Sequence, residues 1–120
     1  MHCQPIISFG HKWRVKSLLK ADELPFVKFD IYGDLIKKGE ETVEHLVPLS
    51  QGGASSEINY AIANKFKNNL RGSEPLNLWT TLSKVIAYYK QFLGIKVGDF
   101  DGTQYCENGL EYIKKLDLKG

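Results

Sequence analysis

The residues best suited to chemistry lie in one stretch of the 120-residue chain, beginning at the adjacent pair Glu44 and His45. Hydrolysis of a phosphodiester needs a base that takes a proton from water, and histidine suits this task because its pKa lies near neutrality. The reaction also needs positive charge beside the phosphate and the leaving oxygen, which a divalent cation supplies. The Glu44 carboxylate and the Asn68 amide provide oxygen ligands of the kind that Mg²⁺ prefers.

An acid and a histidine that are adjacent in sequence raise a geometric problem. Successive side chains of a β-strand point to opposite faces. Glu44 and His45 therefore cannot both face one helix from a regular strand. We expect a bend or bulge at one of the two, near Pro48, which cannot donate a hydrogen bond to a neighbouring strand.

The elements that would position these residues are two short strands and a helix. Residues 42–49 are β-like, with branched Thr42, Val43 and Val47. Residues 50–56 are small and predict a loop, and a second strand is expected at residues 59–62. A helix should begin after Asn64 and end near residue 71, because asparagine is a good N-cap and Gly72 a good helix stop.

The faces of this helix follow from its spacing. Phe66 and Leu70 lie four residues apart and are expected to point inward. Asn64, Asn68 and Arg71 are expected to share the opposite face.

The flanking segments predict further helices around this unit. A loop or a short strand is expected near residues 6–9, a helix over 11–20, a strand over 26–32, a helix over 76–93 and a last helix from Asn108. The fold class is therefore α+β in one domain, with residues 1–40 as an N-terminal flank, 41–72 as the core and 73–120 as a helical C-terminal flank. The aromatic side chains between residues 79 and 92 are expected in the core.

The central motif resembles that of the HNH nuclease family. The matching positions are Glu44-His45, Pro48, Gly52-Gly53, Asn59, Asn68 and Arg71-Gly72. The resemblance implies a ββα-metal fold, a hairpin plus one helix, and an endonuclease that hydrolyses DNA.

The resemblance also implies a role for each residue. His45 would be the general base, and Glu44 and Asn68 would bind one divalent metal ion, Mg²⁺ or Mn²⁺. Asn59 would hold the hairpin loop and help to orient His45. Arg71 would contact phosphate.

The chain departs from the family pattern in two ways. Asn64 and Lys67 stand where many members carry the second Cys-x-x-Cys pair of a structural zinc site, so no structural zinc is expected. Glu44 replaces the commoner aspartate. Separately from the resemblance, Lys65 and Lys67 join Arg71 as cations that could follow a nucleic-acid backbone.

Composition sets wide limits on function. The net charge of +2 is too small to identify a nucleic-acid partner by itself. No signal peptide and no run long enough to cross a membrane is visible, so a cytoplasmic protein with no membrane partner is expected. Cys3 and Cys106 could form a disulfide, but free thiols are favoured in a reducing compartment.

Three functions remain open from the sequence. The first is a metal-dependent DNA endonuclease that leaves a 5′-phosphate and a 3′-hydroxyl. The second is a non-catalytic nucleic-acid-binding module that keeps the ββα shape, and the third is a nuclease whose substrate is RNA. A single site cuts one strand at a time, so a double-strand break would require a homodimer or two visits.

Overall fold

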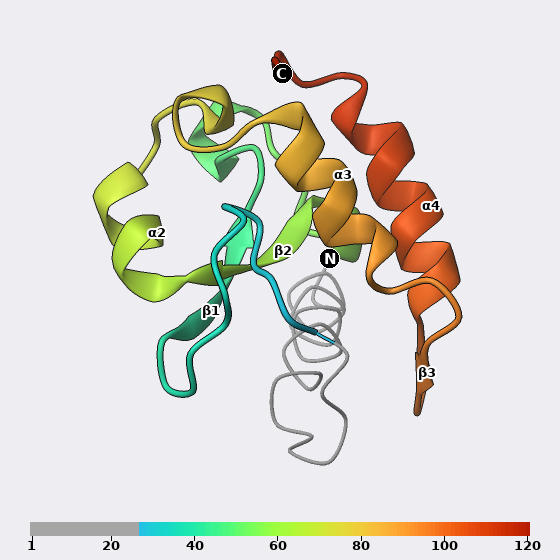
Figure 1. Cartoon of the computed structure of the whole chain (residues 1–120). Helices are drawn as coiled ribbons and strands as arrows, with labels where there is room; N and C mark the ends of the chain where they lie inside the picture. Colours follow the sequence, from blue (N-terminus) through green and yellow to red (C-terminus); the bar gives the residue numbers. More distant parts are fainter. Residues whose placement is uncertain (1–26) are drawn as a thin grey trace, which may run out of the picture.

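The structure is a computed structural model that describes residues 27–120, and the described part has an α+β fold. Its strands are β1 (Glu41–His45), β2 (Tyr60–Asn64), β3 (Lys96–Val97) and β4 (Phe100–Asp101), and its α-helices are α2 (Lys65–Arg71), α3 (Leu82–Lys90) and α4 (Gly102–Ile113). Figure 1 shows α2 on one side of the β1–β2 hairpin and the pair α3 and α4 on the other. The expected elements at residues 6–9 and 11–20, and Cys3, lie outside the described residues.

The two strands of the core pair as a regular antiparallel hairpin. The register runs without interruption from Glu41 opposite Asn64 to His45 opposite Tyr60. Both predicted strands exist, although β1 ends at His45 rather than at residue 49. The expected bend or bulge at Glu44 or His45 is wrong, because both residues belong to the regular ladder.

Helix α2 begins and ends where the sequence predicts. The Asn64 side chain accepts hydrogen bonds from the backbone N–H groups of Phe66 and Lys67, which satisfies two of the free donors at the helix start. Gly72 ends the helix with a φ of 55°, and its N–H donates to the Asn68 carbonyl. A left-handed φ of this kind favours glycine, since it lacks a Cβ.

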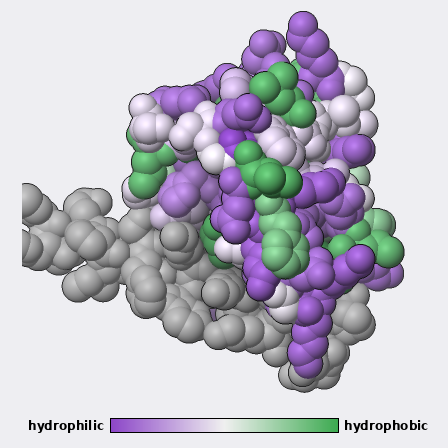
Figure 2. Space-filling view, turned by 90° about the vertical axis from the view of Figure 1, so that its left-hand side faces the viewer, coloured by the Kyte–Doolittle hydropathy of each residue, from purple (hydrophilic) through white to green (hydrophobic). Residues whose placement is uncertain are grey.

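The faces of α2 are the reverse of the prediction. Phe66 and Leu70 are 55% and 74% exposed, whereas Arg71 is only 2% exposed. Arg71 packs on the hairpin because its guanidinium meets the Glu44 carboxylate and the His45 and Leu46 carbonyls there. Figure 2, which views the molecule from the side on which α2 lies, shows apolar side chains set among hydrophilic ones.

The C-terminal helices differ from their predicted bounds. The expected helix over 76–93 is divided into a 3-10 turn, Leu76–Leu78, and α3, which starts after Thr81. Helix α4 starts at Gly102 rather than at Asn108, because the Asp101 side chain accepts a hydrogen bond from the Gln104 N–H and caps the helix there.

A close approach between α3 and α4 explains a glycine within the second of these helices. A Cβ on Gly109 would lie 2.1 Å from the ring of Tyr89. Glycine destabilises a helix interior relative to alanine, so its presence in α4 is accounted for by this contact.

The segment before β1 is a turn rather than the strand expected over residues 26–32. Its described part forms one isolated bridge, between Phe29 and Leu35. The buried Asp30 carboxylate accepts hydrogen bonds from the backbone N–H groups of Tyr32, Asp34 and Asn64. These bonds fix the turn to the end of β2 and hold Tyr32 against the hairpin.

An aromatic cluster fills the core between the hairpin and the C-terminal helices. Its members, all at most 3% exposed, are Tyr88, Tyr89, Phe92, Phe100 and Tyr105. The Tyr88 hydroxyl accepts from the Ile62 N–H at 2.8 Å, and the Tyr105 hydroxyl donates to the Tyr60 carbonyl at 2.7 Å. Phe92 lies in the core as expected. None of the helices in the described part combines the length and apolar character needed to cross a membrane.

The tyrosine cluster should make the fold sensitive to alkaline pH. Burial raises the pKa of Tyr88, Tyr89 and Tyr105 above the ordinary value of 10.0. A group whose pKa is raised on folding stabilises the fold below its unfolded pKa, and this contribution is lost as the pH rises further. We therefore expect the free energy of unfolding to fall above about pH 10.

The measurement is a titration of phenolate absorbance beside far-UV circular dichroism. Part of the phenolate signal should appear only together with the loss of helix. Complete tyrosine ionisation while the helices remain intact would contradict the buried cluster.

Candidate functional site

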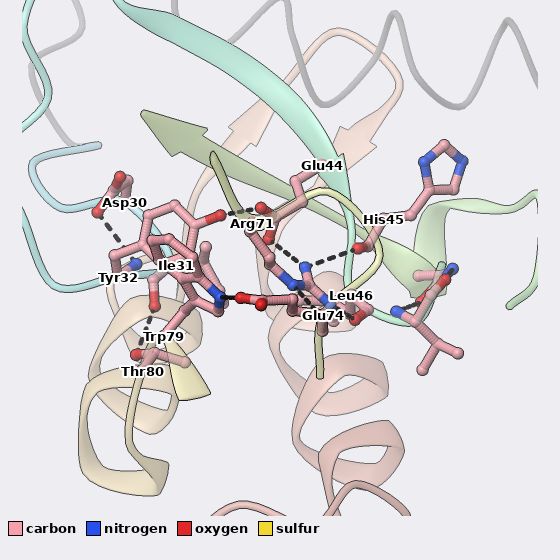
Figure 3. Close-up of polar contacts among 12 residues, drawn as sticks. Asp30, Ile31, Tyr32, Glu44, His45, Leu46, Arg71, Glu74, Trp79 and Thr80 are labelled. Atoms are coloured by element: carbon pink, nitrogen blue, oxygen red, sulfur yellow. Dashed lines mark hydrogen bonds and ion pairs between the residues drawn. The ribbon is translucent and has the colours of Figure 1, made fainter. Parts of the chain in front are cut away.

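The centre of the site is a buried acid on the inner face of the hairpin. Glu44 is 2% exposed, and its side chain points from β1 toward Arg71 and Tyr32 (Figure 3). Its Oε1 lies 2.9 Å from Nη1 of Arg71, and its Oε2 accepts a hydrogen bond from the Tyr32 hydroxyl. The carboxylate is thus paired with a cation and a hydroxyl group inside the protein.

Arg71 extends this contact to the backbone at the end of β1. Its Nη1 donates to the His45 carbonyl at 3.1 Å, and its Nη2 donates to the Leu46 carbonyl at 2.6 Å. Its Nε donates to the Glu74 carbonyl at 2.8 Å. The planar guanidinium suits such a set of acceptors because its donors form a fixed fork. Arg71 therefore joins the last turn of α2 to the last residue of β1.

The protonation of this cluster follows from its burial. Burial raises the pKa of the Glu44 carboxyl, while the Tyr32 hydroxyl and the Arg71 guanidinium offset part of that rise. Burial also raises the pKa of Tyr32, and the neighbouring Glu44 charge raises it further. Tyr32 therefore stays protonated, and its hydroxyl donates a hydrogen bond to the Glu44 carboxylate.

His45 lies on the other face of the hairpin. Figure 3 shows its imidazole pointing away from Glu44 and Arg71, as the regular strand requires. The ring is partly exposed and packs edge-on against Tyr60, with the ring centroids 5.0 Å apart. Glu44 and His45 therefore do not converge on a common point.

The remaining predicted contacts lie on α2. Asn68 is partly exposed, and no hydrogen bond of its side chain is found within residues 27–120. Lys65 is exposed and lies over the Phe66 ring at 5.3 Å. Lys67 forms an ion pair of 2.5 Å with Asp34, in which both side chains remain more than 40% exposed. Exposed pairs of this kind contribute little to stability, so Lys67 could exchange Asp34 for another anion.

Asn59 closes the loop that follows β1. Its Oδ1 accepts from the Val47 N–H at 2.9 Å and from the Tyr112 hydroxyl at 3.1 Å. Its Nδ2 donates to the carbonyls of Val47 and Ala54 at 2.8 and 2.9 Å. Each of these bonds ends on the loop or on α4, and the side chain is fully buried.

The glycine pair of the motif contributes to the same closure. A Cβ on Gly53 would lie 1.8 Å from the Val47 carbonyl oxygen and 2.8 Å from the Asn59 amide nitrogen. Only glycine allows the loop backbone to approach Asn59 this closely. Gly52 adopts a φ of 86°, which also favours glycine.

The position of Glu44 does not fit its predicted role as a metal ligand. Glu44 would have to offer its carboxylate to the ion, but that group is buried and neutralised by Arg71. Arg71 is buried with it, so in this arrangement it does not reach an external phosphate. We therefore assign no reaction step to a cation on Glu44 and Asn68.

No protein-family model matches the chain, and no curated protein matches it either. The resemblance of residues 44–72 to HNH nucleases therefore rests on the motif itself and on the order strand, strand, helix in the fold.

Two contacts of the site were not foreseen from the sequence. Tyr32 and Tyr112 each place a hydroxyl on a motif residue, the first on Glu44 and the second on Asn59. Both lie outside the motif, and the spacing of the motif residues does not indicate either of them.

Asn59→Ala should destabilise the protein strongly. The substitution leaves the partly buried N–H and carbonyl of Val47 without these side-chain partners, and unsatisfied buried groups cost about 1–3 kcal/mol each. We expect a loss of about 2–4 kcal/mol in the free energy of unfolding, measured by urea denaturation.

The matched control is Asn69→Ala, which removes the same side chain from an exposed position on α2. It should change the free energy of unfolding by no more than about 0.5 kcal/mol. Equal effects of the two substitutions would show that Asn59 does not hold the loop.

Proposed function

We propose that this protein is an endonuclease built on a ββα unit, which hydrolyses DNA phosphodiesters with His45 as the general base. The observation that supports it is the position of His45. A partly exposed histidine stands at the end of β1, directly before a loop that Asn59 closes, and β2 and the helix capped by Asn64 follow in the chain. This is the order of elements expected for the motif that the sequence resembles.

The chemistry assigned to the chain is proton transfer and charge neutralisation. The neutral imidazole of His45 takes a proton from a water molecule that attacks the phosphorus in line with the 3′ oxygen. The bond between phosphorus and the 3′ oxygen breaks, and the 3′ oxygen takes a proton from solvent water, which gives a 5′-phosphate and a 3′-hydroxyl. Lys65 and Lys67, on the solvent side of α2, offset charge on the DNA backbone.

His45→Ala tests the general base. Removing a general base typically slows hydrolysis by about 10²–10⁴-fold, so nicking of supercoiled plasmid should fall by that factor. The assay is run with Mg²⁺, with Mn²⁺ and with EDTA, and the ends are characterised with a ligase and a phosphatase. Because the imidazole is only partly buried, the thermal unfolding midpoint should change little.

Asn69→Ala serves again as the control and should cut at the wild-type rate. Near-wild-type nicking by the His45→Ala variant would remove His45 from the mechanism.

A second candidate is a nucleic-acid-binding module without catalytic activity. The observation that favours it is the Glu44–Arg71 ion pair, since the acid of the motif is engaged inside the protein. The same plasmid assay separates the two functions, because retarded plasmid with no product under any metal condition supports the module. Competition between DNA and RNA oligonucleotides of the same sequence then identifies the preferred nucleic acid.

A further inference from the structure

The four oxygen atoms around Arg71 form an unusual set for an arginine inside a small protein. They are one carboxylate oxygen, from Glu44, and the backbone carbonyls of His45, Leu46 and Glu74. Carboxylates and backbone carbonyls are also the ligands that hard divalent cations take in proteins. The guanidinium thus lies where oxygen atoms from β1, the following loop and the end of α2 converge.

We propose that the Arg71 guanidinium takes the place of a bound cation among these oxygen atoms. It also acts as a positioning residue, because its hydrogen bond to the His45 carbonyl holds the His45 imidazole in place. The catalytic part of this proposal rests on the proposed function. Its structural part concerns only the site as it stands, and can be tested in a protein with no activity.

The backbone at His45 is held from several sides. Nη1 of Arg71 lies between the Glu44 carboxylate at 2.9 Å and the His45 carbonyl at 3.1 Å. On the next residue, Nη2 holds the Leu46 carbonyl, while the Leu46 N–H donates to the Asn59 carbonyl at 2.8 Å. The imidazole itself rests on Tyr60. Of these contacts, those of Arg71 are the ones that connect the His45 backbone to α2.

Burial makes the guanidinium and the carboxylate depend on each other. The side chains of Arg71 and Glu44 are 1% and 2% exposed. Removal of one partner leaves a buried charge without compensation, which is strongly destabilising. A lysine at position 71 would keep the charge but not the planar fork, so it could satisfy only part of the four acceptors.

A cavity beside Arg71 allows a chemical test. It has a volume of about 130 Å³, and its lining includes Leu46, Gln51, Arg71, Leu76 and Leu118. In an Arg71→Ala variant this space would join the volume left by the side chain. A free guanidinium ion has the shape and charge of the missing group and could enter by this route.

The experiment compares the wild type with Arg71→Ala, Arg71→Lys and the control Asn69→Ala, which removes an exposed side chain of α2. The first measurement is the His45 imidazole resonance in a ¹H–¹³C spectrum, assigned with a His45→Gln variant. The second is the thermal unfolding midpoint, with and without low millimolar guanidinium chloride, against tetramethylammonium chloride as the salt control. The third is single-turnover cleavage of plasmid.

The proposal expects Arg71→Ala to shift the His45 resonance and to lower the unfolding midpoint, with guanidinium but not tetramethylammonium restoring part of both. Where the wild type cuts DNA, the maximal rate should fall on the order of tenfold to a hundredfold, because small displacements of a catalytic group have effects of this size. The apparent affinity for DNA should stay within about twofold, since Arg71 is not assigned to the DNA surface. Asn69→Ala should leave the His45 resonance and the cleavage rate as in the wild type.

Two results would overturn the proposal. One is an unchanged His45 resonance in a folded Arg71→Ala variant; if that variant does not fold, the same result in Arg71→Lys has the same force. The other is a strong rise of the wild-type unfolding midpoint with Mg²⁺ or Mn²⁺ that Glu44→Gln abolishes, because Glu44 would then be a metal ligand. A wild type that cuts no DNA would refute the proposed function, while the resonance and the midpoints would still test the role of Arg71.

Discussion

The buried ion pair between Glu44 and Arg71 is the constraint on which the rest of the core depends. Neither charge could stay in the interior alone, because the loss of hydration would exceed any gain from packing. Their pairing requires that β1 place Glu44 on its inner face and that α2 end with Arg71 turned toward the hairpin. Tyr32 supplies a further donor from the turn before β1, so three separate segments meet at one carboxylate.

This constraint explains the orientation of α2, which the spacing of its apolar residues did not predict. The i, i+4 pair Phe66 and Leu70 is ordinarily a sign of an inward face. Here Arg71 points inward, because it donates hydrogen bonds to the carbonyls of His45 and Leu46, which lie about 25 positions earlier in the chain. A pattern within one helix carries no information about such distant acceptors. The spacing of Phe66 and Leu70 therefore predicted the wrong inward face for this helix.

Residue types at the ends of elements, and the β-branched residues within one strand, correctly predicted α2 and β1. Asn64 and Gly72 gave the ends of α2, and the β-branched residues after position 41 gave the first strand. The start of α4 was missed because the helix was expected to begin at Asn108, whereas it is capped by Asp101 and begins at Gly102, six residues earlier. In the candidate site, the sequence identified Asn59 as a loop residue. Its hydrogen bonds to Val47 and Tyr112 depend on how the chain folds back on itself.

The regular register of the hairpin separates two residues that the motif places side by side. Had a bulge interrupted β1, Glu44 and His45 could have turned toward the same cation. With the ladder intact, the acid points inward to Arg71 and the imidazole points outward against Tyr60. The two are then connected through the backbone, because the guanidinium that neutralises Glu44 also holds the carbonyl of His45. In this arrangement the acid can influence the histidine without touching it, by fixing the cation that fixes the strand.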